Sequence, residues 1–308
     1  MRRSLALVSL LYILGAAADN SAQTGGGQSP FGLGVGSREL ALGGADVATC
    51  DYATAPYWNP ARLAQSEQYS VMGFHTRLFD ADVAYQYLGI VIPTLDWGSV
   101  GIGVTRLGVD GIEKRDASNL LLDTLADTRL GLRVGYGRTI GSLDLGVALS
   151  LESHSLDTSK AMSTPGVDVA ATRMVSFPIS WCDKVSFTLV GRNVIAPSMR
   201  LVDETVKAPF EFHAGVSTKL LLPHDTRQSL DIFGGFSKPN SALAVGLLGL
   251  EFSLFDILRL RGSFREDQIS GGAGITYNGV SFDYALVDRD LGALHDAIVD
   301  HEHRQICE

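Results

Sequence analysis

Apolar and small polar residues alternate along most of the chain after Tyr69, in runs of about nine to thirteen residues. In one such run Leu143, Leu145, Val147 and Leu149 share one parity, while small or polar residues such as Gly146 hold the other. Successive side chains of a strand point to opposite faces, so a period of two predicts β-strands and excludes a helix.

The same alternation recurs about thirteen times, with turn signals between the runs. Tyr277-Asn278-Gly279 and Lys238-Pro239-Asn240 are typical of tight turns, and the connections over 110–127 and 156–166 are longer. The apolar stretch 241–260 contains Gly246, Gly249, Glu251 and Asp256, which predicts two strands joined by a turn near Phe255-Asp256. We therefore expect an all-β, antiparallel chain.

The polar face of these strands distinguishes a soluble sandwich from a membrane barrel. It carries mainly Gly, Ser, Thr and Ala with isolated charges. This composition fits the lumen of a barrel that has to hold something better than it fits the solvated surface of a sheet. Strand lengths agree, because a tilted membrane strand needs about 9 to 11 residues and typical soluble strands have about 5 to 6. The pattern predicts a transmembrane β-barrel over residues 69–299.

Charged and titratable residues on the small-residue parity are predicted to face the lumen: Arg129, Arg133, Asp144, Glu152, Glu211, His213, Lys219, Arg259, Arg261 and Arg265. They favour a charge network that fills and stiffens the interior, with a ligand site as the alternative.

The first 18 residues are predicted to be a signal peptide. Arg2 and Arg3 precede an apolar run over 5–14, and three alanines follow at 16–18, where we expect cleavage. A membrane-spanning anchor is the alternative, but the run is shorter than the roughly 20 residues that a helix needs to cross a bilayer. Export and the barrel pattern together indicate the outer membrane of a diderm bacterium.

Residues 19–68 do not alternate and are predicted to form a hatch, or plug, ahead of the barrel. Arg38 to Ala48 suits a short helix, and Tyr57 and Trp58 suit apolar anchors. Asn59 suits a helix cap and Pro60 the first position of a short helix that continues over 61–65. The alternative is an N-terminal turn packed outside the barrel.

Composition excludes several functional classes. Of the 308 residues 45% are hydrophobic, and the net charge is -9 with dispersed basic residues, which argues against a nucleic-acid partner. Cys50, Cys182 and Cys307 form no Cys-x-x-Cys pair, and the chain has no Gly-x-Ser-x-Gly motif and no distinguishable catalytic carboxylate pair. We expect no enzyme, no cofactor and no metal.

The chain ends in HDAIVDHEHRQICE. His301 and His303, with Asp300, Glu302 and His295, are a candidate metal site, but termini are commonly unordered, which favours a solvated polar tail over 300–308. Residues 295–299 are a candidate for a weak closing strand.

Residues 37–64, SRELALGGADVATCDYATAPYWNPARLA, resemble the N-terminal signature of outer-membrane barrels of the FadL (long-chain fatty-acid transporter) superfamily. The PorV/PorQ-type branch is more similar still. Its last strands resemble 254–291, LFDILRLRGSFREDQISGGAGITYNGVSFDYALVDRDL, and its strand-to-loop pattern resembles 185–201, VSFTLVGRNVIAPSMRL. The resemblance implies a barrel of about 14 strands in which Asn59, Pro60 and Ala61, with Tyr57 and Trp58, belong to an internal hatch. Family members usually end in a strand with a terminal aromatic residue, which is missing here.

Two non-enzymatic functions follow. One is a PorV-like component of protein export or surface attachment, whose partners would be secretion-system components; it predicts long, ordered surface loops. The other is a hatch-gated conduit for a hydrophobic small molecule such as a fatty acid. It predicts an apolar pocket near the hatch, lined by Tyr57, Trp58, Leu63 and an inward Phe233. Both place the protein in outer-membrane lipid.

Overall fold

A computed structural model describes residues 30–78, 83–94, 97–116, 118–156, 159–179, 182–201, 204–221, 227–240, 243–266, 268–288 and 304–307. The predicted signal peptide over 1–18, the strand candidate at 295–299 and the residues at 300–303 lie outside these ranges.

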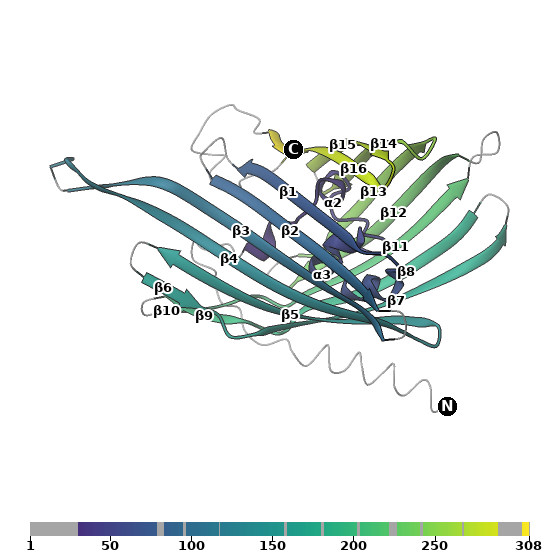
Figure 1. Cartoon of the computed structure of the whole chain (residues 1–308), viewed down its shortest axis with the longest axis horizontal. Helices are drawn as coiled ribbons and strands as arrows, with labels where there is room; N and C mark the ends of the chain where they lie inside the picture. The colour runs from purple at the N-terminus through teal and green to yellow at the C-terminus, as the bar shows by residue number, and fades with distance from the viewer. Residues whose placement is uncertain are drawn as a thin grey trace.

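Fourteen of the fifteen strands in the main sheet form a closed antiparallel ring, because the β1 to β4 end of the sheet pairs back onto β5 (Figure 1). In chain order the ring strands are β1 (Ser70–Leu78), β2 (Val83–Thr94), β3 (Gly98–Arg115), β4 (Leu121–Ile140), β5 (Leu143–Leu156), β7 (Gly166–Ile179), β8 (Cys182–Ile195), β11 (Glu211–Leu221), β12 (Gln228–Pro239), β13 (Val245–Leu254), β14 (Leu258–Arg265), β15 (Gln268–Tyr277), β16 (Val280–Asp288) and β17 (Arg304–Cys307). The fifteenth strand, β6 (Ser159–Met162), pairs only with β5, and β9 (Ser198–Leu201) and β10 (Glu204–Lys207) form a separate hairpin. The predicted 14-strand barrel is confirmed.

The ring is closed by the C-terminal β17. It pairs with β16 from Ala285 to Asp288, and Cys307 also lies opposite Thr76 of β1. The prediction that residues 300–308 are a tail outside the barrel is therefore wrong for 304–307. A membrane barrel leaves no sheet edge open, since an unpaired N–H or C=O in lipid is costly. A four-residue strand is too short for its alternation to be seen in the sequence.

The two faces of the strands follow the predicted parity. In β4, Leu130, Leu132, Val134 and Tyr136 are exposed on the outside, while Arg133 is only 2% exposed on the inside. Apolar side chains also lie on the outer face of other ring strands, such as Leu88 and Ile90 of β2 and Leu248 and Leu250 of β13. A continuous apolar outer band is typical of a barrel in lipid, and a soluble protein rarely exposes such a surface. No helix among the described residues is long and apolar enough to span a membrane.

Short turns connect the strands at one end of the barrel, here called the short-turn end. Asn278 and Gly279 both have positive φ (48° and 81°), as a two-residue β-hairpin turn of type I′ requires. Phe255 and Asp256 (55° and 58°) turn the chain between β13 and β14, so the prediction for 241–260 is confirmed.

At the opposite end, the long-loop end, β3 and β4 continue far beyond the ring as a projecting hairpin (Figure 1). The sequence predicted a connection over 110–127, but most of it extends the two strands. Alternation weakens there because neither face of the hairpin is buried: the exposed residues include Ile112 and Leu120.

Candidate functional site

The segment before β1 lies inside the barrel. Its elements are η1 (Pro30–Gly32), α2 (Ser37–Ala41), η2 (Tyr52–Thr54), α3 (Ala55–Trp58) and η3 (Pro60–Gln65). They touch opposite parts of the wall: α2 packs on β14, β15 and β16, η2 on β1, β2 and β3, and η3 on β3, β4, β5 and β7. Figure 1 shows α2 and α3 enclosed by the strands. Residues 30–68, called the hatch below, are therefore an internal plug, and the alternative of a turn outside the barrel is wrong.

Glycines on the inner face of the wall make room for the hatch. A Cβ atom on Gly101 would lie 2.9 Å from the Leu63 side chain, and one on Gly215 would lie 2.5 Å from that of Val47. At Gly146 a Cβ atom would overlap the backbone between Pro60 and Ala61. The small residues on the polar parity thus hold the hatch itself.

Asn59 caps η3 and also ties it to the wall. Its side-chain oxygen accepts from the Ala61 N–H at 3.1 Å, and Pro60 occupies the first helical position, as predicted. The side-chain nitrogen donates to the Val47 carbonyl at 2.8 Å and to the hydroxyls of Thr172 (3.1 Å) and Thr188 (3.0 Å) on β7 and β8. Asn59 is completely buried, so each of these groups is shielded from water.

Two arginines from different walls bind the same hatch carbonyl. Arg133 on β4 and Arg192 on β8 each donate to the Tyr57 carbonyl at 2.9 Å. Arg133 also pairs with Asp168 at 3.3 Å, and both guanidiniums lie over the Tyr57 ring, at 5.2 and 4.8 Å from its centroid. The contacts hold the centre of the hatch against β4 and β8, which are separated in the ring by β5 and β7.

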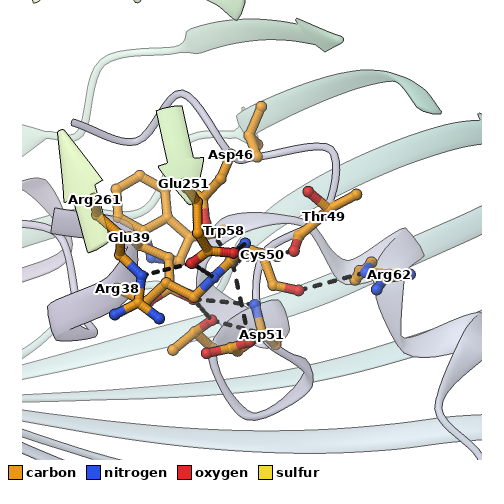
Figure 2. A network of polar contacts seen from close by, with 12 residues as sticks. Arg38, Glu39, Asp46, Thr49, Cys50, Asp51, Trp58, Arg62, Glu251 and Arg261 are labelled. Atoms are coloured by element: carbon orange, nitrogen blue, oxygen red, sulfur yellow. Dashed lines mark hydrogen bonds and ion pairs between the residues drawn. The ribbon is translucent and has the colours of Figure 1, made fainter. Parts of the chain in front are cut away.

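Arg38 of α2 forms the third attachment (Figure 2). Its guanidinium pairs with Asp46 of the hatch at 2.7 Å and with Glu251 of β13 at 3.1 Å. Glu251 also accepts from Arg261 of β14 at 2.5 Å, and Arg261 in turn pairs with Asp283 of β16. This chain of buried charges links the hatch to three strands.

Two hatch carboxyls close to Arg38 have raised pKa values. Glu39 is fully buried and accepts from the Thr54 hydroxyl at 2.5 Å and the Asp51 N–H at 3.1 Å. Burial, with the neighbouring Asp51 and Asp46 carboxylates, raises the pKa of Glu39 to about 8. Burial also raises the pKa of Asp46 to about 6, against the opposing effect of Arg38. Glu39 is therefore mainly neutral at pH 7.

A cavity of about 410 Å³ lies between the hatch and the β7 to β14 side of the wall. Its wall residues come from the ends of strands at the short-turn end, such as Lys184 and Asp256, and its hatch residues include Arg38 and Arg62. Charged, hydroxyl and amide side chains dominate the lining, and Met174 is its one aliphatic side chain.

The predicted apolar pocket at the hatch is not formed by the residues expected to line it. Tyr57, Trp58 and Leu63 are buried in the main hydrophobic cluster of the hatch, and the inward Phe233 packs against Leu42 in a second one. Close packing of the hatch against the wall buries this apolar surface, so none of it is left to line a pocket. The cavity described above is polar instead.

The predicted lumen-facing residues lie on the inner side of the wall, but at different levels. Arg133, Asp144, His213 and Arg261 are buried; Arg129, Glu152, Glu211, Lys219 and Arg259 are half-buried; Arg265 is exposed at the long-loop end. Asp144 contacts Gln65 of the hatch, His213 lies 3.3 Å from Glu211, and Lys219 and Arg259 line the cavity. The ion pairs favour the interpretation as a charge network.

Sequence reasoning missed four buried polar residues that hold the hatch. The alternation of inner and outer positions could have identified Arg192, Thr172 and Thr188 as inward-facing. Thr188 and Arg192, for example, share the inner face of β8 with Ser186. Arg38 gave a weaker signal, an arginine and a glutamate side by side in an otherwise apolar segment.

Metal-ligand clusters are absent from the described residues, and Cys50 and Cys182 are buried free thiols. The candidate metal site around His301 and His303 lies outside the described residues.

No protein-family model matches the chain, and no curated protein matches it. Among solved structures, the chain is similar to the Pseudomonas putida toluene transporter TodX, with a TM-score of 0.49, 11% identity, and coverage of 89% of this chain and 96% of that one. A TodX deltaS2S3 mutant, described as a monoaromatic hydrocarbon channel, gives a TM-score of 0.43 at 10% identity with the same coverage. Likenesses of this size identify neither the family nor the cargo of this chain.

Proposed function

We propose that this protein is a non-enzymatic transport barrel of the bacterial outer membrane, in which the hatch controls passage of a small molecule. The observation that supports the proposal most directly is the attachment of the hatch. A segment of the chain lies in the lumen of a closed barrel, yet apart from its peptide link to β1 it is held to the wall by polar and apolar side-chain contacts and not by covalent bonds. Such contacts can be exchanged for water or a ligand, so the hatch can move without unfolding the barrel.

The orientation follows from the two ends. Barrels of the outer membrane have short periplasmic turns and longer extracellular loops. The short-turn end and its cavity therefore face the periplasm in this proposal, and the β3–β4 hairpin faces outward. Membership of the FadL superfamily, in the PorV/PorQ-type branch, remains part of the proposal and rests on the quoted sequence stretches.

The test is to loosen the hatch and measure flux. Asn59→Ala removes the cap of η3 and the hydrogen bonds from its side-chain nitrogen to the Val47 carbonyl and two wall hydroxyls. We expect liposomes containing this variant to take up arabinose several-fold faster than liposomes containing the natural protein. The matched control is Asn240→Ala, in the turn after β12, where the backbone N–H of Asn240 donates to the Phe210 carbonyl and is kept in the variant. If both variants match protein-free liposomes, the proposal of hatch-controlled transport is wrong.

A second candidate, docking of an exported protein, is favoured by the β3–β4 hairpin. Its tip exposes Leu120, Leu121 and Leu122 at 65%, 48% and 59%, well beyond the ring. Exposed apolar side chains at the end of an ordered projection suit a protein contact.

Changing these three leucines to serine tests the docking candidate. We expect about a tenfold loss of surface-attached proteins, measured by mass spectrometry of intact cells, because the apolar contact would be removed. Lys114→Gln with Arg115→Gln changes the same hairpin without removing apolar surface and is the control. An unchanged surface proteome with the leucine variant would exclude docking through this hairpin.

A further inference from the structure

The cavity at the short-turn end is large enough for a small molecule and is built for a polar one. Its volume of about 410 Å³ lies within the range of about 300 to 1,000 Å³ that ligand sites span. Hydroxyls of Ser186, Ser217 and Ser253 from three different strands line it. Hydroxyl donors converging from several strands suit a hydroxylated solute and do not suit a hydrocarbon.

The charges around the cavity are not balanced. Among the described residues five basic and four acidic side chains line it, and two of the acids pair with arginines. Glu251 is held between Arg38 and Arg261, and Asp51 lies 4.0 Å from Arg38. Asp231 lies directly across from Lys219 on the neighbouring strand. Only Asp256, exposed in the β13–β14 turn, faces the cavity without such a neighbour.

Three of the cations have neither a described carboxylate within 4.0 Å nor a carboxylate directly across on a neighbouring strand. No described carboxylate lies within 4.0 Å of the charged groups of Arg62, Lys184 or Arg259. Arg62 is positioned by the hatch, where it stacks on the Tyr52 ring at 4.7 Å and donates to the Cys50 carbonyl. Lys184 and Arg259 come from β8 and β14, so the unpaired cations approach the cavity from three sides.

From this arrangement we propose that the cavity binds a small hydrophilic anion, a hydroxylated solute that carries a carboxylate or a phosphate. Arginine and lysine donate charge-assisted hydrogen bonds to both groups, and the serine hydroxyls contact the rest of the solute. Its role as the entry or exit site of transport rests on the proposed function above; the binding itself does not. The inference replaces the hydrophobic cargo expected from the sequence.

Binding to the purified, full-length mature chain in detergent tests this inference by saturation-transfer NMR. The probes are gluconate for the carboxylate, glucose 6-phosphate for the phosphate, and sorbitol as the neutral hydroxylated control. We expect one or both anions to bind, sorbitol to bind at least about tenfold more weakly, and the anion affinity to fall as salt is raised. Whichever anion binds more tightly identifies the group that the site prefers.

Lys184→Gln combined with Arg259→Gln should weaken anion binding about tenfold or more, because it removes two of the three unpaired cations. Lys114→Gln, on the exposed hairpin at the opposite end, is the control and should not change it. The inference is overturned if neither anion binds, if sorbitol binds equally well, or if the double variant binds like the natural protein. If arabinose passes through the Asn59→Ala barrel but no anion binds, the inference of an anion site is wrong and the proposed transport function stands. If an anion binds but no flux is seen, the anion site stands and only its role in transport is wrong.

Discussion

Replacing Gly146 by alanine should displace the hatch, whereas the same replacement at Gly246 should leave the protein unchanged. The added methyl group at Gly146 would overlap the backbone between Pro60 and Ala61 and would lie 2.6 Å from the Ala61 Cα. Neither the strand nor a capped helix can move by rotating a side chain, so the hatch has to shift. At Gly246, on the outer face of β13, nothing lies within 4 Å of the added methyl group.

We expect the Gly146→Ala variant to lose about 1 to 3 kcal/mol of stability, the usual cost of forcing a methyl group into a packed interior. Limited trypsin digestion of the folded barrel measures the local effect, because Arg38 in the hatch is buried in the natural protein and becomes accessible once the hatch shifts. Gly246→Ala provides the baseline for both measurements. Equal trypsin protection of the two variants would show that the hatch does not rest on the β5 wall.

Local chemistry in the hatch could be predicted from the sequence. Asn59 and Pro60 are adjacent, and a cap followed by proline at the first helical position needs only these two residues and their neighbours. Alternation likewise assigned Arg133 and Gly146 to the inner face, because parity is a property of each strand alone. Such features depend on contacts between residues that are close in the sequence.

Attachments between hatch and wall could not be predicted in the same way. Arg38 and Glu251 are 213 residues apart, and which strand meets α2 depends on how all fourteen strands close. The sequence also led to an apolar pocket at Tyr57 and Trp58, since it shows apolar side chains but not the buried cluster in which these two pack. The polar cavity lies where the apolar packing of the hatch against the wall ends.

The anchoring role of Arg38 gives the second prediction with a large effect. Arg38→Met keeps the volume and aliphatic stem of the side chain but leaves Asp46, 0% exposed, without its cation; Glu251 retains Arg261. A buried ion pair broken on one side typically costs about 3 to 5 kcal/mol. We therefore expect a loss of that size in urea unfolding at pH 8, with faster hydrogen exchange in residues 37–51.

The matched variant and the pH separate charge from packing. Adding Asp46→Asn to Arg38→Met should recover part of the loss, because it removes the unpaired charge and keeps the shape of the side chain. An acid whose pKa is raised on folding opposes folding as it ionises, so its cost appears as the pH rises through that value. The pKa of Asp46 is about 6 even beside Arg38, so the loss caused by Arg38→Met should be smaller at pH 5 than at pH 8. A loss that is the same at both pH values and is not relieved by Asp46→Asn would mean that Arg38 holds the hatch by packing, for instance on the Phe233 ring at 5.7 Å, and not by its charge.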